Sequence, residues 1–381
     1  MNPFKTFFGN KLNFLVGFIF MTHSLLISQW IIYIPHVKDK LTLSEGDLGL
    51  ALFCLALGAF TIMPISSKII NALGDGRTTF YSLIFYALVV PLPFLTEHFV
   101  WLCVTLYLIG AGAGLMDIAM NALASTVEKE KKVFIMSGCH GFFSLGAMIG
   151  AGSGSVIAVY QVSPFWHTVV VGAVLLIIHF IVVGIYAGIK SKQDTQSTQL
   201  KFSIKAILGL VIIGFCIMIG EGAVADWSTV YLKEHVKADV LFWGFGFAGF
   251  SFAMAVGRFA GDIIGAKYGA LNIIRVGGII GVIGLGGVLT GDLVLTIVGF
   301  SLVGFGFSGI VPVLYRISSN LKTVPASQGI AAIAGSGYVG FLLGPVILGF
   351  VAEVSSLKGS FALLLVLTLI TVVISRKSIE H

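Results

Sequence analysis

The sequence predicts an all-α membrane protein with twelve transmembrane helices in two pseudo-symmetric six-helix bundles. Hydrophobic residues make up 57% of the 381 residues and charged residues only 10%, which is too little charge for the surface of a soluble protein. The first half also recurs weakly in the second, because Leu108–Ala113 is echoed by Leu302–Phe307 and Trp30 by Trp227. Such a repeat predicts two halves that face each other across a central cavity.

Each predicted helix is an apolar stretch near the ~20 residues that a membrane span needs. The first stretch lacks a cleavage pattern after its apolar core, so we expect it to remain as the first helix. Polar residues dominate 190–203, which we interpret as a cytoplasmic linker between an N-terminal bundle at 1–189 and a C-terminal bundle at 204–381. The expected helices are residues 11–34, 46–70, 78–96, 101–126, 134–159, 165–189, 204–231, 241–264, 270–290, 292–317, 328–352 and 359–376.

The lysines and arginines predict the orientation, because they gather in cytoplasmic loops. One side of the predicted spans carries most of them, and the other side carries only Lys38, Lys40, Lys233, Lys237 and Lys358. We therefore expect both termini and the linker in the cytoplasm. The net charge of +6 is spread singly near helix ends, which argues against a nucleic-acid partner.

A charged motif lies in the cytoplasmic loop that follows the second helix of each half. The first copy runs from Ser67 to Arg77, with Asn71 and Ala72 where an acid and an arginine are expected, and the second has Arg258 and Asp262 one helical turn apart. Both resemble the G-x-L-x-D-R-x-G-R-R motif of the major facilitator superfamily. The resemblance implies that fold and a latch between helix ends, made here by Asp75, Arg77, Arg258, Asp262 and Lys267.

Three further stretches resemble the bacterial fucose permease and rhizopine-transporter-like branch of that superfamily. They are Met116–Glu128, Cys139–Gly146 and Glu221–Ser228. The resemblance implies a transporter in the bacterial inner membrane that moves a sugar- or polyol-like solute by alternating access. Helix 5 also lacks the proline of the drug-antiporter motif, and this favours symport over export.

Buried ionisable residues are the candidates for proton coupling, since each is costly inside a bilayer. Asp117 is the first choice, with Asn121 one turn away on the same face; Glu221 and His140 are the others. A permanent pairing with polar neighbours is the alternative for each. The chain has no Walker motif, paired metal ligands or hydrolase motif, so we expect no cofactor, no metal and no enzyme activity, with the proton gradient as energy source.

Polar and aromatic side chains near these acids are the candidates for solute binding, because sugar sites combine hydroxyl-pairing groups with aromatic faces. Glu221 and Asp226 are offset by about 140° around their helix, so they are not expected to share a face. Trp30 and Trp227 fit either an outer gate or an interfacial belt. The full set is His23, Gln29, Trp30, Asn121, Asp226, Trp227, Tyr315 and Tyr338.

Two other functions stay open. Proton-coupled efflux of drugs or metabolites is the first, and a substrate sensor that no longer cycles is the second, which the degraded first latch favours. Arg316 is the one cavity candidate that suits an anion outside the latch, so a neutral solute is expected. We expect a functional monomer whose partners are the lipid bilayer and a small-molecule substrate.

Overall fold

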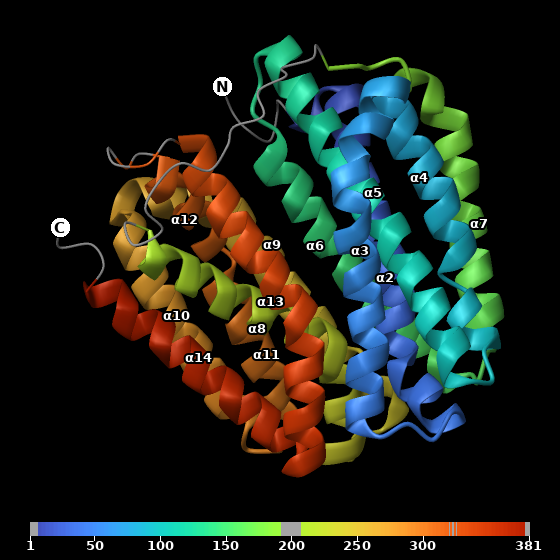
Figure 1. Ribbon diagram of the computed structural model, residues 1–381, viewed down its shortest axis with the longest axis vertical. Helices are drawn as coiled ribbons and strands as arrows, with labels where there is room; N and C mark the ends of the chain where they lie inside the picture. The colour runs from blue at the N-terminus through green and yellow to red at the C-terminus, as the bar shows by residue number, and fades with distance from the viewer. Residues whose placement is uncertain (1–6, 192–206, 320, 322–323, 325, 378–381) are drawn as a thin grey trace.

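Helices and short connections make up all of the chain that the computed structural model describes, which is residues 7–191, 207–319, 321, 324 and 326–377 (Figure 1). The side chains of residues 261–268, 326, 327, 376 and 377 lie outside this description. Twelve of the described helical segments are long and apolar enough to cross a membrane. The predicted all-α fold with twelve transmembrane helices is confirmed.

Polar side chains cap the starts of the first two of the six N-terminal spans. Asn10 accepts from two backbone amides at the start of the first helix, and Ser44 and Asp47 form a capping box at the start of the second. The elements are α2 (Lys11–Lys40), α3 (Glu45–Leu73), α4 (Asp75–Val89) with the 3-10 turn η1 (Leu92–Leu95), α5 (Phe99–Lys131), α6 (Met136–Val159) and α7 (Pro164–Val182) with η2 (Val183–Ile185).

The last six spans include one broken helix, which the sequence predicted as continuous over 292–317. The chain turns at Ser308 and Gly309, where the Ser308 hydroxyl donates to the Phe305 carbonyl (2.7 Å), and then continues. The elements are α8 (Leu208–Val230) with the π turn η4 (Tyr231–His235), η5 (Val240–Phe242), α9 (Phe245–Tyr268), α10 (Ala270–Val288), α11 (Leu293–Phe307), α12 (Ile310–Ser319), α13 (Ala326–Val354) and α14 (Leu357–Lys377).

The internal repeat is visible in the backbone where the second helix of each half stops. Gly74 ends α3 with φ of +90°, and Gly269 follows α9 with φ of +78°. Side chains other than glycine rarely adopt such values. Two glycines 195 positions apart therefore make the same turn.

The helices lie in two groups, α2 to α7 and α8 to α14 (Figure 1). Across the boundary α3 packs against α13, α6 against α9 and α2 against α8. Within the first group the glycine face of α6 lies on α2, since a Cβ at Gly146 would be 2.2 Å from the Met21 carbonyl oxygen. That face is a packing seam.

An even number of spans places the start of α2 and the end of α14 at the same end of the molecule (Figure 1). We call this the termini end and the opposite one the far end. The predicted linker at 190–203 lies almost entirely outside the described residues, so its boundaries stay a prediction. Of that segment only residues 190 and 191 are described.

Candidate functional site

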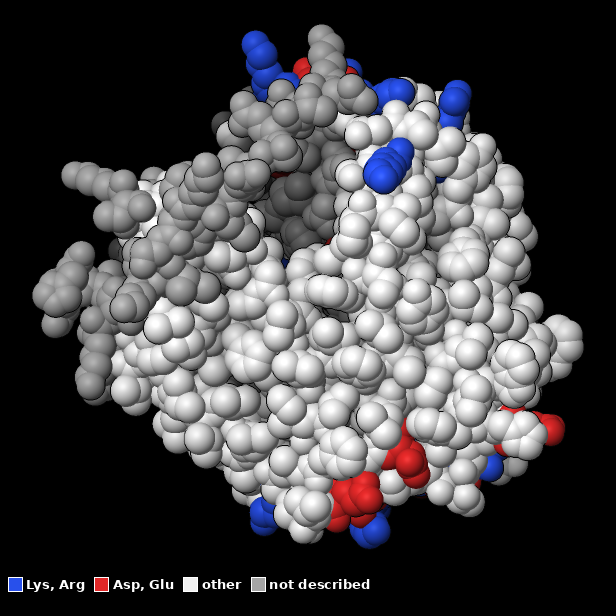
Figure 2. All heavy atoms as spheres, in the orientation of Figure 1, with Lys and Arg blue, Asp and Glu red and all other residues white. Residues whose placement is uncertain are grey.

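A cavity of about 310 Å³ lies between the two groups of helices. Most of its wall is apolar, and Figure 2 shows the surface hollowed between the groups toward the termini end. The side chains that line it from the first group include Trp30, Phe143 and Ser144. Those from the second group include Glu221, Asp226, Phe247, Phe250, Ser251, Arg258 and Tyr338.

Arg258 lies in the cavity wall, whereas the sequence predicted it in a cytoplasmic latch. Its guanidinium is 3.8 Å from the Glu221 carboxylate. It also donates to the Ser144 hydroxyl (2.9 Å) and to the His140 carbonyl (3.4 Å), both on α6. Arg258 therefore joins an acid of its own group to a helix of the other. The side chains of its predicted latch partners, Asp262 and Lys267, lie outside the described residues.

Asp226 lines the same cavity as Glu221, although the helical offset predicted different faces. The cavity wraps around enough of α8 to reach both side chains. Among the residues that the structure describes, no hydrogen bond or ion pair engages the Asp226 carboxylate. Asp226 is thus an acid in a membrane span that has no cationic partner among the described residues.

Asp117 lies on α5 beside its predicted neighbour and is not among the residues that line the cavity. The Asn121 side-chain amide donates to the Asp117 carbonyl (2.8 Å) and to its carboxylate (3.2 Å). Asp117 is also close enough to Tyr315 and Tyr338 to interact with both electrostatically. Of these two tyrosines, Tyr338 lines the cavity.

Three other predicted site residues turn to local partners and are not part of the cavity lining. His23 contacts the Ala113 carbonyl through Nε2 (3.1 Å), and Gln29 donates to the Leu25 carbonyl (3.1 Å). The His140 ring packs edge-on against Phe20, with ring centroids 5.3 Å apart. Two of the three touch a cavity residue: the His140 carbonyl accepts from Arg258, and the His23 ring packs against Phe143 with ring centroids 5.5 Å apart.

The two repeated tryptophans are both buried, with 1% of each exposed. An interfacial belt needs rings at the membrane surface, so that interpretation is wrong. Trp30 lines the cavity, whereas Trp227 is absent from its wall. Neither indole N–H has a partner among the described residues.

Asp75, the acid of the first copy of the predicted latch motif, binds the segment that follows α7. Asp75 is fully buried and accepts from the Thr126 hydroxyl (2.7 Å) and from the Ser191 amide (2.9 Å) and hydroxyl (3.1 Å). Arg77 is exposed. Asp75 thus fixes the start of the predicted linker, a role that the sequence did not indicate.

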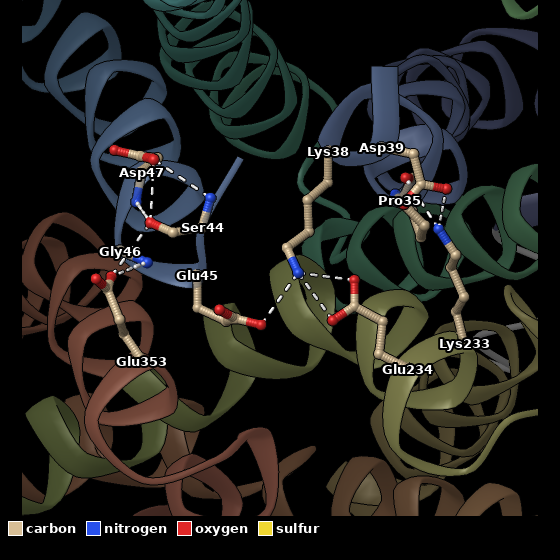
Figure 3. A network of polar contacts seen from close by, with 10 residues as sticks. All are labelled: Pro35, Lys38, Asp39, Ser44, Glu45, Gly46, Asp47, Lys233, Glu234 and Glu353. Atoms are coloured by element: carbon tan, nitrogen blue, oxygen red, sulfur yellow. Dashed lines mark hydrogen bonds and ion pairs between the residues drawn. The ribbon is translucent and has the colours of Figure 1, made fainter. Parts of the chain in front are cut away.

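The far end is closed by ion pairs that cross between the two groups (Figure 3). Lys38 on α2 contacts both carboxylate oxygens of Glu234 at 2.8 Å and Glu45 at 3.1 Å. Lys233 contacts Asp39 and donates to the Pro35 carbonyl (3.4 Å). Each group therefore supplies one lysine and one acid to the other, and we call these four residues the reciprocal pairs.

In the sequence, Lys38 and Lys233 were interpreted only as topology signals, so this contact was missed. The signal was present, because the dipeptide Lys38-Asp39 recurs as Lys233-Glu234 at the repeat spacing of 195 residues. In a two-fold arrangement, such a repeat lets each lysine meet the acid of the other copy.

Two helix starts beside the reciprocal pairs are also held across the boundary. The Gly46 amide at the start of α3 donates to Glu353 on α13 (2.8 Å), and the Ser44 hydroxyl donates to the same oxygen (3.2 Å). The Gly244 amide before α9 donates to the Ser155 hydroxyl on α6 (2.7 Å). A spacing of 198 residues relates Gly46 to Gly244 and Ser155 to Glu353, so these are two copies of one contact.

Known proteins of this architecture match over nearly the whole chain. A solved structure of the nucleoside transporter NupG superposes with a TM-score of 0.72 at 11% identity, covering 97% of this chain and 98% of that one. A bacterial homologue of the human lysosomal transporter Spinster, solved inward-facing and occupied, gives a TM-score of 0.69 at 13% identity, covering 99% and 97%. At these identities the likeness concerns the fold.

Closer relatives are transporters or membrane proteins of bacteria. An uncharacterized MFS-type transporter of Yersinia pestis is 30% identical over 364 residues, which cover 95% of this chain and 94% of that one. The membrane protein MosC of Rhizobium meliloti is 27% identical over 352 residues, covering 91% and 85%. The Major Facilitator Superfamily profile matches residues 12–320. The chain belongs to the Major Facilitator Superfamily and is a multi-pass membrane transporter, not an enzyme.

Proposed function

We propose that this transporter moves a small polar solute by alternating access, in symport with protons. One observation carries the proposal: a cavity lined by both groups holds two acids, and ion pairs between the groups close its far end. Opening the far end requires these pairs to separate. A solute in the cavity then meets one side of the membrane at a time.

The distribution of lysines and arginines supports the cytoplasm as the termini end and the outside as the far end. We propose the bacterial inner membrane as location, a monomer as functional unit and the proton gradient as energy source, without a cofactor. The hollow at the termini end (Figure 2) then corresponds to an inward-open cavity.

Proton coupling is assigned to Asp117 and Glu221. Protonation of Glu221 removes the negative charge that holds Arg258, and Arg258 is the side chain that reaches across to Ser144 on α6. Uptake of one proton therefore alters a contact between the two groups. His140 contributes its carbonyl to the same contact, which is a smaller role than the proton coupling for which the sequence made it a candidate.

The solute class follows from the resemblance to the fucose permease and rhizopine-transporter-like branch, which favours a sugar- or polyol-like molecule. Efflux of drugs or metabolites in exchange for protons is the second candidate. The mostly apolar cavity wall favours that second candidate.

Counterflow in proteoliposomes, with a panel of sugars, cyclitols and cationic dyes, separates the two. We expect neutral polyols to exchange. Exchange of dyes without any polyol would contradict symport of a polar solute and support efflux.

The coupling acid has its own test. Asp117→Asn is expected to abolish pH-driven accumulation and to spare exchange, because the variant binds solute and carries no titratable proton. Glu97→Gln is the matched control, since Glu97 is an exposed acid outside the cavity wall. Normal accumulation by Asp117→Asn would refute its role.

A further inference from the structure

We propose that a second cavity, on the membrane-facing side of the second group of helices, binds one acyl chain of a phospholipid from the leaflet at the termini end. We call it the side cavity, and its volume is about 360 Å³. The inference goes beyond the proposed function, because the lipid is a resident ligand and not the transported solute.

The side cavity lies between α9 and α10, over the break between α11 and α12. The helix breaks there because Pro312 has no amide to continue the ladder of backbone hydrogen bonds. Lining residues without side chains leave the space open, and they are Gly257, Gly277, Gly306 and Gly309. The hollow is therefore built into the packing of these helices.

The side cavity opens toward the bilayer and not toward the central cavity. Val276 and Phe305 line it with 52% and 37% of their surfaces exposed, and neither lines the central cavity. Asn272 and Ser308 are the polar members of its described lining. In the hydrocarbon region no water is available to fill such a hollow. The occupant is therefore apolar, and the apolar neighbours that the bilayer supplies are acyl chains.

The length of the side cavity matches one leaflet. Along α10 its lining starts at Asn272, two residues after the helix begins at the termini end, and reaches Ile280. These two residues are eight positions apart, which corresponds to about 12 Å along the helix. One leaflet contributes about 15 Å, half of the ~30 Å hydrocarbon core. A single chain that enters beside Asn272 therefore fills the cavity without leaving its leaflet.

In the first group a side chain fills the space that is equivalent to the α9 side of this cavity. Ile62 on α3 corresponds to Gly257 on α9 at the repeat spacing of 195 residues. A Cβ at Gly114 on α5 would lie 3.1 Å from the Ile62 Cγ2 atom, so Ile62 packs on α5. Gly257 has no side chain with which to fill the equivalent space.

The α10 side differs from its repeat partner in the same way. Phe85 on α4 corresponds to Ile280, and a Cβ at Gly112 on α5 would lie 3.0 Å from the Phe85 ring. The helix α5 is also continuous, whereas α11 and α12 are broken. Close-packed interiors seldom leave a void larger than a water molecule. A hollow of this size, at a place that the other half fills with its own side chains, points to a bound group.

The side cavity and the central cavity lie on two faces of one turn of α9. Gly257 lines the first, and the next residue, Arg258, lines the second. An acyl chain packed against Gly257 supports the turn that carries Arg258, whose guanidinium contacts Glu221 and Ser144. The lipid thereby stabilises a contact between the two groups of helices.

The test is photolabelling of the full-length protein in nanodiscs of phosphatidylethanolamine and phosphatidylglycerol. A trace of phosphatidylethanolamine with a diazirine in its acyl chain is included, and labelled peptides are located by mass spectrometry. Tyr81 on α4 is the internal reference, since it is equivalent to Val276 by the repeat, is 53% exposed and lines neither cavity. We expect the peptides that contain Val276 and Phe305 to be labelled several times more than the Tyr81 peptide, because a bound chain stays beside them longer than a passing lipid does.

Variants that fill the side cavity assign the labelling to it. Ile280→Phe introduces the residue that the first half has at Phe85, and Val276→Trp narrows the opening. Each is expected to lower labelling of the Phe305 peptide to the level of the Tyr81 reference. Tyr81→Trp is the matched control and should leave labelling of the Phe305 peptide unchanged. Because Val276 is about half exposed, Val276→Trp adds bulk outside the core, and gel filtration checks that the variant is folded.

Three outcomes would overturn the lipid site. Equal labelling of the Val276, Phe305 and Tyr81 peptides would show only the lipid that surrounds any membrane protein. Unchanged labelling of the Phe305 peptide in both Ile280→Phe and Val276→Trp would place the label outside the side cavity. If the cationic dyes of the counterflow panel displace the label from the Phe305 peptide and not from the Tyr81 peptide, the cavity binds a lipophilic solute and the lipid assignment is wrong.

Discussion

The two sides of the far end differ in chemistry although the repeat makes them equivalent. On one side the Gly244 amide donates to Ser155, a neutral side chain that is fully buried. On the other the Gly46 amide donates to Glu353, a charged residue that is exposed. A neutral buried contact excludes water, whereas an exposed carboxylate can exchange its partner for water at small cost.

This difference suggests which side moves. A Cβ at Gly244 would lie 2.5 Å from the Ala151 carbonyl oxygen of α6, so backbones touch there. A Cβ at Gly46 would meet the Glu353 carboxylate and the Phe350 ring, whereas the backbones of α3 and α13 touch one turn further along, where a Cβ at Gly49 would lie 2.7 Å from the Pro345 carbonyl oxygen. The two sides therefore differ in the chemistry of the contact at the helix start, not in whether backbones touch. We expect the α6–α9 side to serve as the pivot and the α3–α13 side to separate first, with the reciprocal pairs between them.

The largest effect is expected from reversing the charge between the two sides. Lys38→Glu places three acids together where Lys38 now contacts Glu45 and Glu234. Only 9% of the Lys38 side chain is exposed, so closure should weaken by about 2–5 kcal/mol. The measurement is outside labelling by an impermeant maleimide of Ser144→Cys, in a background without the four native cysteines.

The charge swap is the control for that prediction. Lys38→Glu combined with Glu234→Lys restores one attraction across the boundary and should return labelling toward the original rate. Equal labelling of single and double variants would show that the reciprocal pairs do not hold the far end shut.

A smaller effect separates the pivot from the opening side. Ser155→Ala leaves the buried Gly244 amide without its acceptor, at a cost of about 1–3 kcal/mol. Glu353→Ala leaves the Gly46 amide near water, and we expect less than about 1 kcal/mol. Thermal midpoints of the two variants in nanodiscs provide the comparison, and a larger loss for Glu353→Ala would reverse the assignment of pivot and opening side.

Features that depend on one helix were predictable from the sequence. Twelve apolar stretches predicted the spans, the four-residue spacing predicted the contact between Asp117 and Asn121, and the repeated Gly74 and Gly269 marked equivalent helix ends. Each follows from local geometry.

Features that depend on how the two groups meet were not predictable. Arg258 was placed in a latch, because its spacing to Asp262 is a local pattern, whereas Glu221 and Ser144 come near it only in the folded bundle. The angle between Asp226 and Glu221 around α8 predicted different faces for the two side chains, yet both line the same cavity. Hydropathy says nothing of such contacts.

The smallest effect concerns the two members of the reciprocal pairs, which are equivalent by the repeat and unequal in exposure. Asp39 has 62% of its side chain exposed and Glu234 has 24%. Solvent and salt screen the first pair more strongly, so Asp39→Asn should weaken closure by less than about 1 kcal/mol and Glu234→Gln by more. Maleimide labelling of Ser144→Cys at 0.05 M and 1 M salt measures both.

High salt should remove most of the difference in labelling rate between Asp39→Asn and the parent, because it screens the exposed pair in the parent as well. Labelling of Glu234→Gln should stay clearly faster than that of the parent, since its partner Lys38 is nearly buried. If Asp39→Asn and Glu234→Gln changed the labelling rate equally at both salt concentrations, exposure would not distinguish the two pairs. The two pairs would then be equivalent in strength as well as in their positions in the repeat.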